Sequence, residues 1–334
     1  MRPPFDPELE AALVRRRDEV VRTLETHEIA ALRGRSLGPV AVEEAAAGRV
    51  RTEVLSARGN GGRPDVEVVL LRPADPTAAD APVPWFLHLH GGGLVTGTAW
   101  DDVVPLLDLA VEAGCAIASV GYRLAPEHPF PAALDDAATA LTWLVAHAPA
   151  LGLDPARCVV EGISAGGGLA AALALVARDS GWPPLAGQML LCPMLDDRND
   201  SPSAVQMAGH GAWDRTANAT AWGAYLGGAA GGPDVPAHAA PARASDLAGL
   251  PPAFLDVGSA ETFRDEVVDY AKRLWRSGCA AELHVWPGGF HGFDYFEPTA
   301  VLSRHAREAR RRWLQRVLRP VAPPPVVAAD GGAR

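Results

Sequence analysis

The stretch VVEGISAGGGL, residues 159–169, places one serine among four glycines, between a β-branched run and an Ala- and Leu-rich run. Gly162, Ser164 and Gly166 match the pattern G-x-S-x-G, in which a strand turns sharply into a helix and the serine sits on the turn. Glycine is needed on both sides because a side chain there would collide with the neighbouring backbone. The helix N-terminus adds positive partial charge beneath the serine. The stretch therefore predicts a strand–turn–helix unit with Ser164 as a candidate nucleophile.

Hydrophobic periodicity around this unit predicts strands that alternate with helices. Apolar runs typical of strands buried on both faces occupy residues 83–90, 116–122, 158–163, 187–194, 253–259 and 281–287. Helical patterns occupy residues 103–113, 132–148, 165–179, 265–277 and 300–317. Two earlier strands are expected at 50–56 and 66–72. This order predicts an α/β fold, with a mostly parallel central sheet and helices on both faces.

Two segments depart from this alternation. Residues 6–33 have the pattern of one amphipathic helix, with Asp6 as its N-cap and Pro7 in its first position. Residues 198–250 lack the alternation and contain several large side chains among glycines and alanines. These side chains either fix the segment to the body of the protein or line a pocket, and the sequence leaves both open: Met207, Trp213, Trp222 and Tyr225.

The composition restricts the class of protein. With 334 residues, 48% of them hydrophobic and 21% charged, the chain is typical of a globular protein with a large core. A net charge of −10 repels phosphate backbones, so nucleic acid is not an expected partner. The four cysteines lack a C-x-x-C pair and are expected to be buried free thiols. Because neither a signal-peptide core nor a membrane-length apolar run is seen, we expect a cytoplasmic protein without stable membrane insertion.

A serine hydroxyl is a poor nucleophile at neutral pH, so a base must accept its proton. His291 follows the last predicted strand, and loops at the carboxyl edge of a parallel sheet are where active groups collect. The base in turn needs a carboxylate that fixes its tautomer. We select Glu261, which directly follows strand 253–259. Asp265 is the alternative; it ranks second because it is expected to open the next helix, where a carboxylate suits the helix dipole.

The developing oxyanion of acyl transfer needs N–H donors. The glycine run 91–93 follows strand 83–90 and supplies backbone N–H groups for which no other use is predicted. The N–H of Ala165, directly after the nucleophile, is a further donor. His88 and His90 form an H-x-H pattern, but no third ligand follows at a suitable spacing, so no metal site is expected.

Five blocks, in this order, resemble the hormone-sensitive-lipase-like branch of the α/β-hydrolases, often called bacterial family IV esterases. The blocks are HGGG at 90–93, GYRLAPEHPFP at 121–131, GISAGGG at 162–168, SAETFRDE at 259–266 and FHGF at 290–293. The resemblance extends from about residue 50 to residue 317.

The resemblance implies a serine carboxylesterase that hydrolyses short- to medium-chain acyl esters without a cofactor. It implies Ser164 as nucleophile and His291 as base, with oxyanion donors at Gly91, Gly92, Gly93 and Ala165. It also implies a cap built from N-terminal helices and a mid-chain insertion. The expected organisation is cap segments at 1–48 and 198–250, α/β-hydrolase core at 49–197 and 251–318, and a disordered tail at 319–334.

One block departs from the family pattern. The usual acid block reads D-P-L-R-D-E, whereas residues 261–266 read ETFRDE, so Glu261 stands in the place of the usual aspartate and the expected triad is Ser-His-Glu. Two further blocks are interpreted as structural. Tyr122, Arg123 and Glu127 are expected to brace the HGGG loop, and the acids of residues 194–200 are expected to anchor the insertion.

The expected partner is a small-molecule ester, and pairing into a homodimer is left open. A substrate pocket is expected at Leu94, Met207, Trp213, Trp222 and Tyr225. The same site fits an amidase, formamidase, lactonase or acyltransferase, because the triad does not separate these reactions. A non-catalytic receptor for a small ligand is the alternative from another class, and the intact His291 argues against it.

Overall fold

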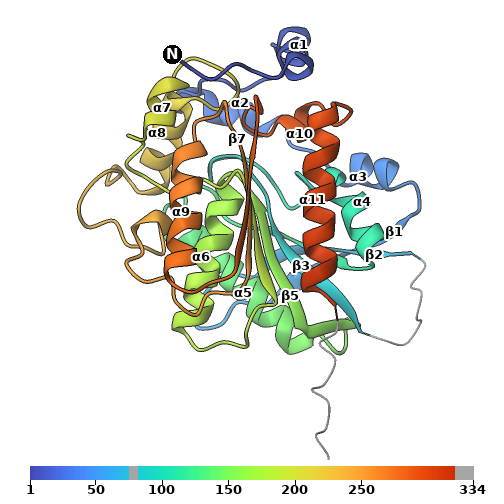
Figure 1. Ribbon diagram of the computed structural model, residues 1–334. Coiled ribbons are helices and arrows are strands. Elements are labelled where there is room, and N and C mark those ends of the chain that lie inside the picture. The colour runs from blue at the N-terminus through green and yellow to red at the C-terminus, as the bar shows by residue number, and fades with distance from the viewer. Residues whose placement is uncertain (75–81, 320–334) are drawn as a thin grey trace, which may run out of the picture.

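The computed structural model describes residues 1–74 and 82–319 of the chain (Figure 1). The strands of this described part form one sheet in the order β1-β2-β4-β3-β5-β6-β7-β8. β2 runs antiparallel to β1 and β4, and every other neighbouring pair is parallel. The strands are β1 Val50–Ala57, β2 Val66–Pro73, β3 Val83–Leu89, β4 Ala116–Gly121, β5 Leu153–Ile163, β6 Gly187–Leu191, β7 Ala253–Gly258 and β8 Ala281–Trp286. The predicted parallel sheet is confirmed.

Helices cover both faces of the sheet, as the alternation predicts. α4 and α11 pack against each other on one face, where α3 also contacts α4, while α5 and α6 lie together on the other (Figure 1). The helices of the core are α4 Val104–Ala113, α5 Ala132–His147, α6 Ala165–Asp179, α9 Arg264–Arg276, α10 Phe293–Phe296 and α11 Val301–Val317. The ends of α4, α5, α6, α9 and α11 fall within a few residues of the predicted ranges, whereas the short helix α10 was not predicted.

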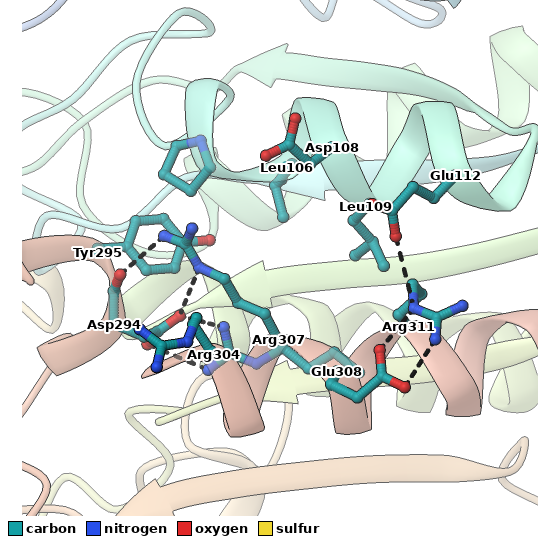
Figure 2. A pocket seen from close by; sticks show the side chains of 12 residues that line it. Leu106, Asp108, Leu109, Glu112, Asp294, Tyr295, Arg304, Arg307, Glu308 and Arg311 are labelled. Atoms are coloured by element: carbon teal, nitrogen blue, oxygen red, sulfur yellow. Dashed lines mark hydrogen bonds and ion pairs between the residues drawn. The ribbon is translucent and has the colours of Figure 1, made fainter. Parts of the chain in front are cut away.

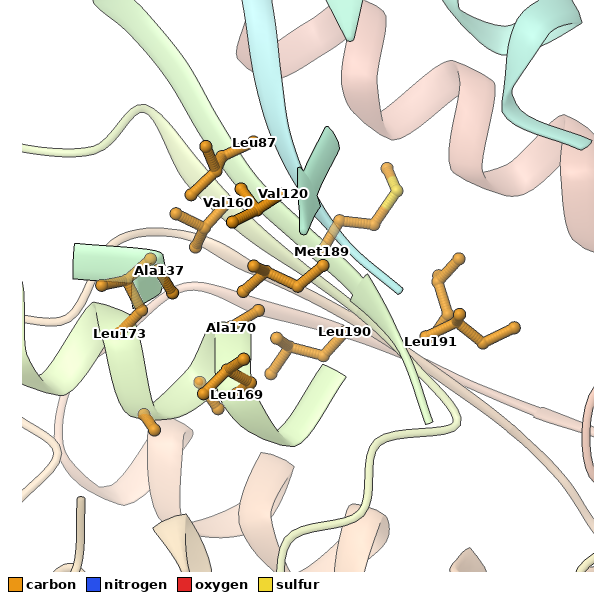
Figure 3. Close-up of a cluster of buried hydrophobic side chains, with 14 of the residues drawn as sticks. Leu87, Val120, Ala137, Val160, Leu169, Ala170, Leu173, Met189, Leu190 and Leu191 are labelled. Atoms are coloured by element: carbon orange, nitrogen blue, oxygen red, sulfur yellow. The ribbon is translucent and has the colours of Figure 1, made fainter. Parts of the chain in front are cut away.

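The core lies between the central strands and α6. Figure 3 shows Leu87 of β3, Val160 of β5 and Leu190 of β6 facing Leu173 of α6, and these four side chains are fully buried. Removing one such leucine from water contributes roughly 1.5–3 kcal/mol. The packing fixes β5 and α6 against each other, so the turn between them, which carries Ser164, is positioned by the buried core.

The N-terminal segment does not form the single helix predicted over residues 6–33. It divides into α1 Pro7–Arg15, the 3-10 turn η1 Thr26–Glu28 and α2 Ile29–Arg33, and α3 Pro39–Ala46 follows. The predicted start is correct, because the Asp6 carboxylate accepts hydrogen bonds from the N–H groups of Glu8 and Leu9. The helix is interrupted because the carbonyls of Val21 and Arg22 accept N–H bonds from residues 213 and 214, at 2.8 and 2.7 Å. A long-range pairing has therefore replaced local helical bonds.

The mid-chain insertion contains α7 Pro202–Gln206, α8 Arg215–Tyr225 and the 3-10 turn η2 Pro241–Arg243. As expected, acids of residues 194–200 anchor it. The Asp197 carboxylate is paired with the Arg243 guanidinium and accepts the Gly231 N–H at 2.7 Å.

The predicted disordered tail, 319–334, lies outside the described residues apart from residue 319. No helix in the described ranges has both the length and the apolar character that a bilayer crossing requires.

Candidate active site

Ser164 lies on the turn between β5 and α6 in a strained backbone conformation, with φ 57° and ψ −121°. The glycines on either side are sterically required. A Cβ on Gly162 would lie 2.2 Å from the Gly166 carbonyl oxygen, and one on Gly166 would lie 1.9 Å from the Leu89 carbonyl oxygen. Strain of this kind persists only where the surrounding structure imposes it. The fold therefore holds the Ser164 hydroxyl in one orientation at the carboxyl end of β5.

The structure brings Ser164, His291 and Glu261 together from three separate loops. His291 Nε2 lies 2.9 Å from Ser164 Oγ, and His291 Nδ1 lies 3.0 Å from Glu261 Oε1. The other carboxylate oxygen of Glu261 accepts the Gly258 N–H at 2.7 Å, so both oxygens are fixed. The Phe263 ring meets the imidazole edge to face, with 5.0 Å between centroids. This is the geometry in which a carboxylate orients an imidazole toward a hydroxyl.

Asp265, the alternative acid, lies elsewhere. Its carboxylate accepts the Ser203 N–H at 2.8 Å and the Arg264 Nε–H at 2.8 Å, at the start of α9. It thus ties the insertion to the core, and Glu261 is the carboxylate in contact with His291. The neighbouring Glu266 is also occupied, because it accepts the Leu195 N–H at 2.7 Å.

The N–H groups expected to face an oxyanion are not equivalent. Those of Gly92 and Gly93 donate to no protein atom in the described part of the chain, and that of Ala165 begins α6, where no helical acceptor exists. The expectation is wrong for Gly91, because its N–H donates to the Asp102 carboxylate at 2.7 Å. Sequence reasoning missed Asp102, and its only signal was an acidic pair shortly after the glycines. Gly91 supports the loop, whereas Gly92, Gly93 and Ala165 keep free donors.

Side chains from two other segments of the chain support the HGGG loop. The Tyr122 hydroxyl donates to the His90 carbonyl at 2.7 Å, and the two rings stack with 4.1 Å between centroids. Burial lowers the pKa of His90 to about 4, so its ring is neutral at pH 7. Arg33 of α2 donates to the carbonyl of Val95 at 2.7 Å and pairs with Glu127. Tyr122 therefore contacts the loop directly, as predicted, and Glu127 acts through Arg33.

Arg123, the third residue expected to brace the loop, does not contact it. Its guanidinium pairs with Asp136 of α5 at 2.8 Å, and its N–H donates to the same carboxylate. The prediction is wrong for this residue because a buried acid on the following helix offers it a closer partner. Arg123 therefore fixes the segment that follows β4 to α5 and does not support the glycines.

The five expected pocket residues differ in their relation to the site. All are nearly or fully buried: Leu94, Met207, Trp213, Trp222 and Tyr225. Trp213 lies directly against the oxyanion loop, because a Cβ on Gly93 would come within 2.6 Å of its Cζ2 and Cη2 atoms. Trp222 and Tyr225 belong to the main hydrophobic core, and the Tyr225 ring meets that of Phe130 edge to face. Among the three aromatic residues, Trp213 therefore has a described contact with the glycine loop, and it belongs to the same hydrophobic core as Trp222 and Tyr225.

Potential metal ligands are engaged in other contacts. His88 Nδ1 lies 2.6 Å from Glu161 Oε2, and His90 Nδ1 donates to the Gly91 carbonyl at 2.7 Å. The H-x-H pattern therefore supplies two imidazoles with separate partners. Donor atoms of Cys192, Glu261 and His291 lie within 4.8 Å of one another, but the last two are already hydrogen-bonded together. Burial and the nearby Glu261 carboxylate raise the pKa of Cys192 well above its ordinary value, which disfavours the thiolate that a metal needs.

Comparison with known proteins places the chain in a family. A family model described as the alpha/beta hydrolase fold matches residues 86–295. The chain is 38% identical to the esterase LipI of Mycobacterium tuberculosis, over 66% of this chain and 68% of that protein. It is also 38% identical to an ethyl acetate hydrolase of Pseudomonas putida, over 68% of this chain and 70% of that protein. The solved structure of a bacterial heroin esterase superposes with a TM-score of 0.85 at 37% identity, over 95% of this chain and 98% of that one.

The family match, the relatives and the superposition agree with the five sequence blocks and with the position of Ser164 on its turn. The chain belongs to the hormone-sensitive-lipase-like branch of the α/β-hydrolase family and is a carboxylic ester hydrolase.

Proposed function

We propose that the chain is a serine carboxylesterase that uses a Ser164-His291-Glu261 triad and prefers short acyl chains. One observation carries the proposal: the hydroxyl of Ser164 lies 2.9 Å from His291 Nε2, while His291 Nδ1 is held by Glu261. A geometry of this kind allows the imidazole to accept the serine proton as the hydroxyl attacks.

The proposed reaction has two steps. Ser164 Oγ attacks the ester carbonyl carbon while His291 accepts its proton, and the oxyanion forms against the N–H groups of Gly92, Gly93 and Ala165. His291 then protonates the leaving alcohol, which leaves an acyl-enzyme. A water molecule gives a proton to His291 and attacks the acyl carbon, and the carboxylic acid departs as the proton returns to Ser164.

The preference for short chains rests on Trp213. Its indole ring lies against Gly93, and the Ala221 Cβ also stands within 3.1 Å of the position that a Gly93 Cβ would occupy. A carbonyl carbon near both Ser164 and Gly93 therefore has an aromatic wall beside it. The name of the related ethyl acetate hydrolase agrees with a small acyl group. Residues 1–48 and 198–250, which pair through Val21 and Trp213, are proposed to form the cap over this site.

Two measurements test the proposal. A fluorophosphonate probe should label the wild-type protein at Ser164 and should not label Ser164→Ala. On a series of p-nitrophenyl esters, activity should fall from acetate to octanoate, and Trp213→Ala should raise the octanoate-to-acetate ratio about tenfold, because one or two methylenes in a pocket are worth that much. Trp275→Ala, on the exposed face of α9, is the matched control and should leave the ratio unchanged. An unlabelled Ser164 in folded protein would overturn the triad, and an unchanged ratio would overturn the role of Trp213.

A further inference from the structure

A cavity of about 360 Å³ lies between α4 and α11, apart from the triad. Figure 2 shows it below the side chains of α4 and above those of α11, with α10 closing one end. Its apolar wall comes from Pro105, Leu106 and Leu109 of α4, and its polar wall comes mainly from α10 and α11. None of the residues placed at the candidate active site lines it, so any ligand it holds does not occupy the reacting centre.

The charged groups in this cavity are unequally partnered. Every carboxylate in the wall has a guanidinium partner: Asp108 pairs with Arg49, Glu112 and Glu308 with Arg311, and Asp294 with Arg310. Two arginines in the wall, Arg304 and Arg307, have no carboxylate partner closer than 4.0 Å among the described residues. In the part of the chain that the structure describes, Arg304 donates to the Thr299 carbonyl and Arg307 donates to the Asp294 carbonyl at 2.8 Å.

Two buried polar atoms at the α10 end lack hydrogen-bond partners within the described residues. They are Arg307 Nε, whose nearest carboxylate oxygen is that of Asp294 at 4.0 Å, and the hydroxyl of Tyr295. Figure 2 shows the Arg307 side chain extending from α11 to reach Tyr295 and Asp294. Buried donors in proteins are nearly always satisfied, and an exception needs an explanation. Neither of these two atoms is exposed to the cavity. The Arg307 side chain is 32% exposed, so its outer guanidinium N–H groups and those of Arg304 are the donors that face the cavity, and the partner that fits them is an acceptor.

We propose that the cavity between α4 and α11 binds a small organic carboxylate. The carboxylate oxygens accept hydrogen bonds from Arg304 and Arg307, and a short apolar body lies against Pro105 and Leu109. A planar guanidinium matches the geometry of a carboxylate, and such charge-assisted bonds are stronger than neutral ones. The apolar wall distinguishes this ligand class from a bare inorganic anion, which would leave the partly exposed Leu109 in contact with water.

The site is connected to the loop that carries His291. α10 begins at Phe293, two residues after His291, and Asp294 and Tyr295 of α10 form part of the cavity wall. A ligand there would contact the element that directly follows the proposed base. The binding proposal does not rest on the proposed reaction, because it is tested without catalysis.

The test is calorimetric titration of the purified full-length chain with butyrate and, separately, with inorganic phosphate. Butyrate should bind saturably, and Arg307→Gln should weaken that binding at least tenfold. The exposed Arg304→Gln should weaken it as well and is the second variant if Arg307→Gln fails to fold. Arg316→Gln removes the same charge from the same helix outside the cavity and should bind butyrate like the wild type.

A further variant tests the apolar half of the site. Leu109→Trp should reduce butyrate binding by filling the space against α4. Phosphate should bind more weakly than butyrate to the wild type. The proposal is overturned if butyrate shows no saturable binding, or if the Arg304 and Arg307 variants bind it as well as Arg316→Gln does. Equal binding of phosphate and butyrate, insensitive to Leu109→Trp, would overturn the carboxylate assignment.

Discussion

Two buried polar clusters lie next to β7 and are built from similar groups. In the first, Glu261 follows the strand and contacts His291, which contacts Ser164. In the second, Asp256 lies within the strand and pairs with Arg310 of α11, which also pairs with Asp294. Both clusters are almost completely shielded from solvent, so burial and charge do not distinguish them.

The difference lies in what each cluster leaves available. Arg310 is enclosed by its two carboxylates; burial alone would lower its pKa, but the carboxylates hold the pKa well above its ordinary value. No reactive atom remains. The cluster of Ser164 ends at a hydroxyl in a strained turn, beside the free N–H groups of Gly92 and Gly93. A buried polar cluster thus indicates a reacting site when it ends at an atom that can react and at donors without partners.

The largest expected effect is the loss of turnover when the reactive hydroxyl of the first cluster is removed. Ser164→Ala should lower ester turnover by about 10⁶-fold, as loss of the nucleophile does in another serine hydrolase. The unfolding midpoint in urea should change little, because the hydroxyl makes one hydrogen bond, to His291. Turnover on p-nitrophenyl acetate and urea unfolding should be measured on the same preparation. Substantial turnover in the folded variant would remove Ser164 from the mechanism.

The second effect separates the two carboxylates of the acid block. Glu261→Gln should lower turnover by about 10⁴-fold, because the amide no longer favours the reactive tautomer of His291. Asp265→Asn is the matched control, since its carboxylate binds the Ser203 N–H and does not contact His291. Asp265→Asn should lower turnover by less than tenfold. If the ranking of the two variants is reversed, the acid of the triad is Asp265.

The third effect is the loss of stability when the cation of the second cluster is removed. Arg310→Met leaves Asp256 buried without its cation and Asp294 with the more distant Arg307 at 4.0 Å, and should lower the free energy of unfolding by about 3–5 kcal/mol. Protein that remains folded should retain far more turnover than Ser164→Ala. Arg312→Met, exposed on the same helix, should cost under about 1 kcal/mol. Equal stability of the two variants would contradict a structural role for the buried cluster.

The smallest effect concerns His90, which supports the oxyanion loop. Burial lowers its pKa from 6.5 to about 4, so between these pH values the unfolded chain binds a proton that the folded chain does not. This group therefore lowers stability as the pH falls from 6.5 to 4, by at most about 3 kcal/mol, and has no effect at higher pH. The difference in unfolding free energy between wild type and His90→Asn should show this slope. His88 is present in both proteins; burial alone would lower its pKa, but Glu161 raises it, so His88 contributes the opposite sign.

Much of the molecule was predictable because the relevant information is local. The strand–turn–helix around Ser164 is encoded within eleven residues. Gly162 and Gly166 are required there because a Cβ on either would lie 2.2 or 1.9 Å from a backbone carbonyl oxygen. The alternation of apolar runs with helical periodicity predicted β3 to β8 and the longer core helices, although β5 begins at Leu153, five residues before its predicted start, and α10 was not predicted. The order of Ser164, Glu261 and His291 along the chain was also readable, because each follows a predicted strand.

Only the tertiary structure decided the features that depend on contacts between distant segments. The N-terminal segment has a helical pattern throughout, yet Val21 and Arg22 bond to residues 213 and 214 instead of to their own helix. Gly91 resembles its neighbours in sequence, but Asp102 takes its N–H. Glu261 and Asp265 both carry a carboxyl group that could serve as the acid, and folding brings Glu261 to His291. Sequence by itself determined which residues can react and where the elements lie. The partner of each polar group was decided by folding, since hydrogen bonding depends on distances of about 3 Å between segments far apart in the chain.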